Sequence, residues 1–102
     1  MNFWDFFGKK DSNSSANKVV ISGGIGLSYE DAVIISAPNS SIGIRAEYDY
    51  LSSIYGESGK SWHLVLQSLA YKDGKHYDIL KIKLRDGSII EYYFDISNFF
   101  GK

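Results

Sequence analysis

His76 and Asp78 are the pair of side chains in this sequence best suited to acid–base chemistry. They are two positions apart, so on a β-strand they lie on one face, where a carboxylate can orient an imidazole as a general base. The second histidine, His63, is predicted to lie on the opposite face of the same sheet, facing Lys83. The two histidines therefore cannot form a dyad or share a metal ion, and we expect no catalytic residues.

Other arrangements that support catalysis or metal binding fail on residue type or spacing. The chain has no cysteine, which excludes disulfides and thiolate metal sites. The acidic residues lack the spacing of a metal-binding loop. The glycine-rich stretch at residues 23–26 matches neither the dinucleotide-binding motif nor the phosphate-binding motif. We therefore expect no enzyme, no metal and no cofactor.

The elements that position these side chains are three antiparallel strands, predicted at residues 61–71, 76–84 and 88–96. Two turns of the form basic-Asp-Gly join them, at residues 72–74 and 85–87, and Asp-Gly between β-branched runs is a strong hairpin signal. We predict a type I turn followed by a left-handed glycine for both, because a two-residue turn would mix charged and apolar side chains on each face.

The register that these turns impose pairs Leu66 with Leu80, and Leu80 with Tyr92, across the three strands. All three strands then present apolar side chains on one face, and this agreement supports the register. The predicted apolar face comprises Trp62, Leu64, Leu66, Leu80, Ile82, Leu84, Ile90, Tyr92 and Phe94.

An α-helix is predicted at residues 42–55, where Ile44, Tyr48, Leu51 and Tyr55 recur at helical spacing. Capping residues precede this segment and a glycine suited to end a helix follows it. We expect the helix to lie across the apolar face of the strands.

Two short β-branched runs, residues 18–22 and 32–36, are predicted to add strands to the same sheet. The predicted fold class is therefore α+β, with one central helix packed on an antiparallel sheet of four or five strands. This single domain covers residues 18–102. It follows an aromatic N-terminal segment and a flexible linker, which together cover residues 1–17.

Four aromatic side chains lie within the first seven residues and require a surface on which to bury. They pack back on their own domain, dock on a partner, exchange between two copies of the chain, or act as a weak membrane anchor. These residues are Phe3, Trp4, Phe6 and Phe7.

The sheet face away from the helix concentrates apolar side chains at one corner, formed by Leu69, Tyr77, Ile79 and Tyr93. An apolar patch with a charged rim is typical of a protein interface. We expect this corner to be covered by the N-terminal segment, by a second copy of the chain or by another protein.

The function that these features favour is a small non-enzymatic module that binds a protein partner or forms a homodimer, like an inhibitor, an immunity protein or an accessory subunit. The first alternative is a small-ligand-binding domain with a pocket between helix and sheet, lined by Tyr48, Trp62 and Tyr92. The second is an enzyme that uses His76 and Asp78.

The charge and hydropathy of the chain exclude some classes of partner. A net charge of −1 argues against nucleic acid, and no apolar run approaches the ~20 residues of a membrane span. The N-terminus lacks the apolar stretch of a secretion signal. We therefore expect a cytoplasmic protein.

Overall fold

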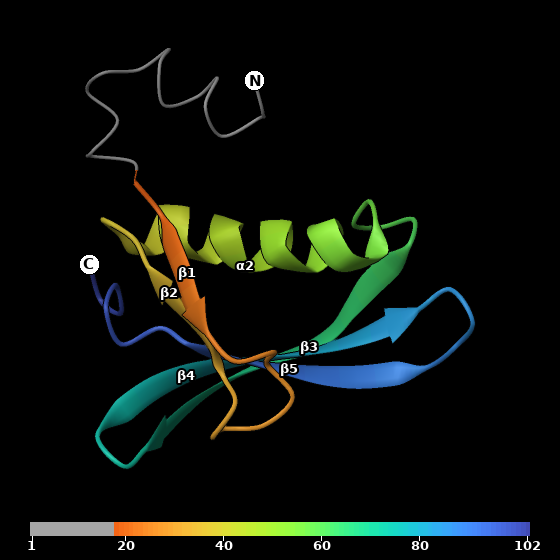
Figure 1. Cartoon of the computed structure of the whole chain (residues 1–102). Coiled ribbons are helices and arrows are strands. Elements are labelled where there is room, and N and C mark those ends of the chain that lie inside the picture. Colours follow the sequence, from red (N-terminus) through yellow and green to blue (C-terminus); the bar gives the residue numbers. More distant parts are fainter. Residues whose placement is uncertain (1–17) are drawn as a thin grey trace.

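The computed structural model describes residues 18–102, which form one helix packed on one face of a five-stranded sheet (Figure 1). In the sheet the strands lie in the order β1-β2-β5-β4-β3, so β1 and β3 are its two edges. The elements, in chain order, are β1 (Val20–Gly23), β2 (Val33–Ser36), α2 (Ser40–Tyr55), β3 (Trp62–Lys72), β4 (Lys75–Leu84) and β5 (Ile89–Asp95).

The α+β class, the helix packed on the sheet and the C-terminal three-strand meander are confirmed. The sheet is mixed rather than wholly antiparallel, because β2 pairs with β5 in parallel, with Val33 opposite Phe94 and Ile34 opposite Asp95. Strand β1 then pairs antiparallel with the other side of β2. The alternation pattern of a short strand specifies its buried face but not the neighbour that it joins, which is why the parallel pair was not predicted.

The turn between β4 and β5 has the predicted geometry, a type I turn with a left-handed glycine. Leu84 donates its N–H to the carbonyl of Ser88 at 2.9 Å, and Gly87 has φ 91°. Asp86 Oδ1 accepts hydrogen bonds from Ser88 N at 2.9 Å and from Ser88 Oγ at 2.6 Å. The serine after the glycine therefore holds the aspartate in this turn.

The turn between β3 and β4 differs, and the predicted bulged turn is wrong here. Lys72 pairs directly with Lys75, and the two residues between them, Asp73 and Gly74, have φ 51° and 80°. These values are those of a two-residue type I′ turn. No serine follows this glycine, and Asp73 takes the left-handed conformation itself, which aspartate tolerates better than most residues.

A β-bulge in β3 accommodates the shorter turn. Leu64 lies opposite Ile82 as predicted, but the register shifts between Leu64 and Leu66. Gln67, rather than the predicted Leu66, therefore lies opposite Leu80. The shift exchanges the two faces of the second half of β3, so Leu66 leaves the face that the helix covers.

The buried face of helix α2 is rotated by about one residue from the predicted apolar stripe. Its buried positions are Gly43, Ala46, Glu47 and Leu51, whereas Ile44 is 45% exposed. The small residues Gly43 and Ala46 allow the helix backbone to approach its neighbours closely. The predicted tyrosines of the stripe consequently lie on the flanks of the helix, half-buried.

The helix begins at Ser40, two residues before the predicted start, and ends at Tyr55 as predicted. Asn39 Oδ1 accepts a hydrogen bond from the Ile42 N–H at 2.9 Å, and Gly56, with φ 110°, ends the helix. The C-terminal residues pack against the first turn, where the Ser40 N–H donates to the carbonyl of Lys102 at 2.9 Å. The end of the chain is therefore part of the folded domain.

Candidate functional site

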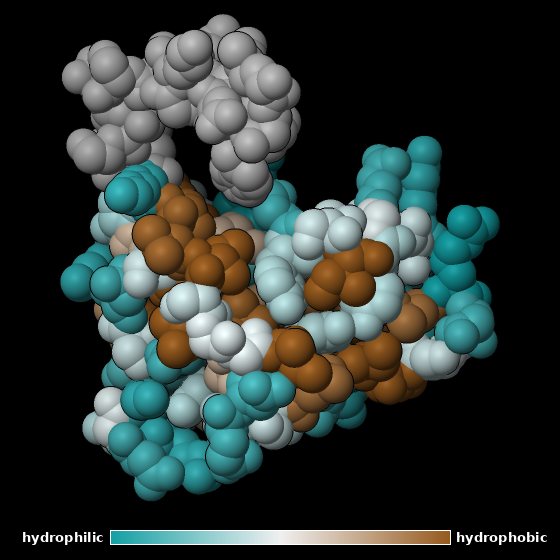
Figure 2. Space-filling model, in the orientation of Figure 1, coloured by the Kyte–Doolittle hydropathy of each residue, from teal (hydrophilic) through white to brown (hydrophobic). Residues whose placement is uncertain are grey.

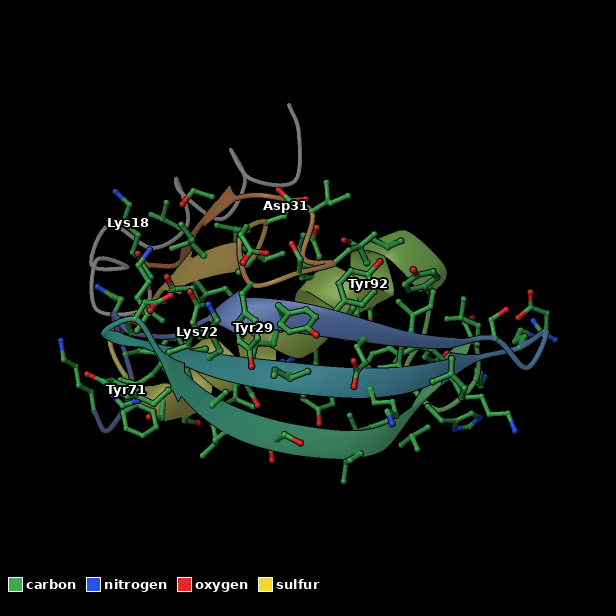
Figure 3. All side chains as sticks on the ribbon, turned by 90° about the horizontal axis from the view of Figure 1, so that it is seen from below. Lys18, Tyr29, Asp31, Tyr71, Lys72 and Tyr92 are labelled. Atoms are coloured by element: carbon green, nitrogen blue, oxygen red, sulfur yellow. The ribbon has the colours of Figure 1, made fainter. Side chains whose placement is uncertain are left out.

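Strand β3 is the longer of the two sheet edges, and among residues 18–102 no strand lies on its outer side (Figure 3). Because Lys72 and Lys75 flank a two-residue turn, they form a hydrogen-bonded pair, and bonded and non-bonded pairs alternate along an antiparallel ladder. The backbone N–H and C=O groups of Gln67, Leu69 and Tyr71 therefore point away from β4. A row of such groups is a template for pairing with another strand.

The side chains of β3 do not protect this edge. The strand contains no proline and no acidic residue, and its only basic or histidine side chains lie near its ends, at His63 and Lys72. Edge strands of natural sheets are normally protected against further pairing by charged side chains, by proline or by short length. Five large apolar side chains on the strand are instead exposed, with exposed fractions between 39% and 69%: Leu64, Val65, Leu66, Leu69 and Tyr71.

The opposite edge, β1, has a different character. Apolar side chains also reach the surface on this side of the molecule (Figure 2), and Val20 and Ile21 are 47% and 45% exposed. The strand has only four residues, however, and short length is itself a protection against edge pairing. The eleven residues of β3 make it the stronger candidate for an interaction.

A cleft of about 210 Å³, here called the α2–β3 cleft, lies between the helix and the exposed half of β3. Its apolar walls come from Ile44 of α2, Leu69 of β3, and Phe99 and Phe100 near the C-terminus. The volume is below that of sites for drug-sized ligands, which occupy roughly 300–1,000 Å³. The cleft therefore suits an occupant the size of a side chain.

Two polar side chains of the sheet line the cleft. Gln67 Nε2 donates a hydrogen bond to Asp78 Oδ1 at 2.6 Å, and Asp78 is only 3% exposed. In the part of the chain that the structure describes, none of the side chains lining the cleft is basic. Within the lining, the Asp78 carboxylate therefore faces neutral groups only.

Glu47 of α2 is fully buried against Asp78. Neither of its carboxyl oxygens has a hydrogen-bond partner of good geometry within residues 18–102. Burial first, and the adjoining Asp78 carboxylate second, raise the pKa of Glu47 to about 10. Glu47 therefore keeps its proton at neutral pH.

Sequence reasoning did not identify Glu47. It lies four residues after Gly43 and four before Leu51, so the three residues form one line along the helix. The predicted stripe comprised Ile44, Tyr48, Leu51 and Tyr55 and did not include Glu47. The available signal was the pair of small residues, Gly43 and Ala46, which marks the side on which the helix packs most closely.

Three residues of the predicted interaction corner, Tyr77, Ile79 and Tyr93, lie together on the sheet face away from the helix. This corner is covered by the chain itself, because the Tyr29 ring from the loop before β2 lies 4.9 Å from both the Tyr77 and the Tyr93 rings. Figure 3 labels Tyr29 on this side of the sheet. Leu69 is not part of the corner, since the bulge places it on the helix side of the sheet, 61% exposed. The exposed apolar surface therefore lies along the β3 edge and not at the predicted corner.

The residues predicted to line a ligand pocket, Tyr48, Trp62 and Tyr92, belong to the core and its margin. Trp62 is fully buried, donates its Nε1–H to the carbonyl of Gly56 at 3.0 Å and packs against Tyr48 at a ring distance of 5.7 Å. The Tyr92 hydroxyl lies 2.7 Å from the Tyr55 hydroxyl, and burial raises the pKa of Tyr92. These contacts hold the helix against the sheet, and none of the three residues lines the α2–β3 cleft.

His76 and Asp78 lie on the helix side of β4 as predicted, but they contact different neighbours. Asp78 is bound by Gln67, whereas the His76 ring stacks on Phe100 with centroids 4.0 Å apart. His63 lies on the opposite face, as predicted. The structure therefore assigns the Asp78 carboxylate to the cleft rather than to an imidazole.

Residues 18–102 contain no group of three histidine, aspartate or glutamate side chains placed to hold a metal ion. Within the same residues, no helix has both the length and the apolar character to cross a membrane. The aromatic residues predicted to form a docking segment, Phe3, Trp4, Phe6 and Phe7, lie outside the described residues.

Comparison with models of protein families, with curated proteins and with solved structures found no match for this chain. The β3 edge and the α2–β3 cleft are therefore the features of the chain that bear on its function.

Proposed function

We propose that this chain is a non-enzymatic protein-interaction module that associates with a second copy of itself by pairing the two β3 strands edge to edge. The observation that carries the proposal is the row of backbone groups at Gln67, Leu69 and Tyr71, which no other strand of residues 18–102 pairs and which exposed apolar side chains flank. We place the module in the cytoplasm, because the chain has no cysteine, and we exclude nucleic acid as a partner because the net charge is −1.

The limits of the regular part of β3 determine the register of the pairing. The bulge ends at Leu66 and the turn begins after Lys72, so the regular segment has Leu69 at its midpoint. An antiparallel pair about a two-fold axis at Leu69 places Gln67 of each copy opposite Tyr71 of the other. This arrangement joins all the outward groups in about six backbone hydrogen bonds. A two-fold axis at any other residue of β3 would bring the bulge or the turn into the paired segment.

The side chains of the segment are compatible with self-pairing. Its one charged residue, Lys72, lies opposite Leu66 of the other copy, so no like charges meet across the axis. Leu69 and Tyr71, which are 61% and 69% exposed, become neighbours of the second copy. Burial of this apolar surface stabilises the dimer in addition to the backbone hydrogen bonds.

The test is the mass of the full chain in solution, measured by light scattering over a range of concentrations. We expect a mass of twice the chain mass of 11.5 kDa, falling to the single-chain mass on dilution. In the Tyr71→Pro variant we expect the single-chain mass throughout, because proline removes an outward N–H. The substitution costs no bond to β4, and proline is tolerated at such edge positions.

The matched control is Tyr71→Thr, which removes the aromatic ring but keeps the backbone N–H. This variant should still dimerise, with an affinity reduced by about tenfold through the loss of two symmetry-related cross-strand side-chain contacts. A single-chain mass for the unaltered protein at all concentrations up to ~1 mM contradicts the proposal, and so does a Tyr71→Pro variant that dimerises as tightly as Tyr71→Thr.

A further inference from the structure

The α2–β3 cleft combines apolar walls with a buried acid, and no basic side chain of residues 18–102 lines it. A buried charge is normally paired, because removing it from water without compensation is costly. Here the Gln67 amide supplies one neutral hydrogen bond to Asp78. The adjoining Glu47 carboxyl is fully buried and has no hydrogen-bond partner of good geometry in the described part of the chain. Among residues 18–102, no basic side chain lines the cleft to pair with these two carboxyl groups.

We propose that the α2–β3 cleft is a binding site for an alkylammonium or alkylguanidinium group, which pairs with Asp78 while its apolar stem lies against Ile44, Leu69, Phe99 and Phe100. This is the chemistry of a lysine or arginine side chain, whose stem packs on apolar surface while its charged head seeks a polar partner. A second copy of β3 paired about Leu69 carries no such group at this position, although Gln67 and Leu69 line the cleft and also lie in the proposed paired segment.

The size of the cleft agrees with this class of ligand. A volume of about 210 Å³ equals that of about seven water molecules at roughly 30 Å³ each, which is enough for a short alkyl chain with a charged end. The walls give the stem an apolar environment, and Asp78, which lines the same cleft, supplies the acceptor for the charged head. Glu47, which is fully buried beside Asp78, stays neutral when the cation is bound.

The experiment is a titration of the isotopically labelled full chain, followed by NMR at the side-chain amide of Gln67. The probes are n-butylammonium and n-butylguanidinium, with 1-butanol as the neutral match and butyrate as the anionic match. We expect saturable shifts with the two cations and at least about tenfold weaker binding of the alcohol and the acid. Equal binding of 1-butanol overturns the proposal, because the cleft would then recognise only the alkyl stem.

Two variants test the site itself. Asp78→Asn keeps the shape and a hydrogen-bonding side chain but removes the charge, and should weaken binding of the cations by at least about tenfold. Ile44→Trp alters a position that is 45% exposed, so it should fold normally, and its larger ring should fill the cleft and abolish binding. The control is Asp49→Asn, an exposed acid on the same helix, which should change nothing. Unchanged binding by either Asp78→Asn or Ile44→Trp overturns the assignment.

The source of the cation is distinguished by two further probes, the N-acetyl methylamide of lysine and 1,5-diaminopentane. Tighter binding of the lysine derivative identifies a protein side chain as the ligand, and tighter binding of the diamine identifies a free polyamine. Both results support the site, whereas binding of neither probe contradicts it. The titrations are repeated on Tyr71→Pro, whose substitution lies outside the cleft lining, so that failure of self-association and failure of cation binding are observed separately.

Discussion

At pH 9 the Glu47→Gln variant should be more stable than the unaltered protein, by about 2–5 kcal/mol of unfolding free energy. Burial against Asp78 raises the pKa of Glu47 from 4.5 to about 10 in the folded state. Below pH 4.5 the group is protonated in both states, and its contribution to stability is fully present. Between pH 4.5 and 10 the unfolded chain releases the proton while the folded chain retains it. Stability therefore falls by up to about 1.4 kcal/mol per pH unit.

Glutamine has nearly the same shape as glutamic acid, is neutral at every pH and can donate to Asp78. Urea unfolding at pH 5, 7 and 9 should therefore show a difference between the two proteins that grows steadily with pH. Glu57→Gln, at an exposed loop residue, is the matched control and should follow the unaltered protein. Parallel stability curves for Glu47→Gln and the unaltered protein from pH 5 to 9 would show that Glu47 is not buried as a neutral acid.

Substituting Gly43 by alanine should destabilise the protein by about 1–3 kcal/mol, although alanine is the better helix former by about 1 kcal/mol. A Cβ at this position would lie 2.5 Å from Cζ of the Phe99 ring, and Phe99 is 1% exposed. The position of the Phe99 ring is fixed, because the C-terminal segment is bound to the start of α2. Ser40 Oγ donates a hydrogen bond to the carbonyl of Phe99 at 3.2 Å. The added methyl group can be accommodated only if the helix or this segment moves.

Thermal and urea unfolding measure this effect, and a double variant assigns it to the contact. Gly43→Ala combined with Phe99→Leu should lose less stability than the sum of the two single changes, because the smaller side chain relieves the overlap. Ser41→Ala, on the exposed side of the same helix, should be neutral or slightly stabilising. A Gly43→Ala protein at least as stable as the unaltered chain would contradict the close approach of helix and ring.

The architecture was largely predictable from the sequence because its signals are local and agree with one another. The Asp-Gly turns, the capping asparagine, the terminal Gly56 and the alternation of β4 and β5 each specify one element, and the register from Leu80–Tyr92 to Ile82–Ile90 is confirmed. The β3–β4 turn was mispredicted because the same three-residue pattern supports two geometries. The residue after the glycine distinguishes them, since Ser88 can bond to Asp86 and Lys75 cannot act in the same way.

The candidate site was much less predictable, because it results from packing between segments distant in the sequence. A bulge between Leu64 and Leu66 exchanged the faces of β3 and moved Leu69 to the helix side. A loop residue, Tyr29, covered the corner that the pattern had marked as an interface. The buried Glu47 could be recognised only once the close-packed side of the helix was known. The bulge and the Tyr29 contact depend on packing that no local pattern encodes.

Amide hydrogen exchange along β3 tests the central claim, self-association through this edge, most directly. In a single chain the N–H groups of Gln67 and Leu69 point to solvent and exchange rapidly, whereas those of Ser68 and Ala70 are bonded to β4 and exchange slowly. We expect the amides of Gln67 and Leu69 to become at least about tenfold slower at high protein concentration, and to remain fast in Tyr71→Pro. Rapid exchange of both amides at every concentration, with Ser68 and Ala70 still protected, would show that the edge of β3 stays unpaired.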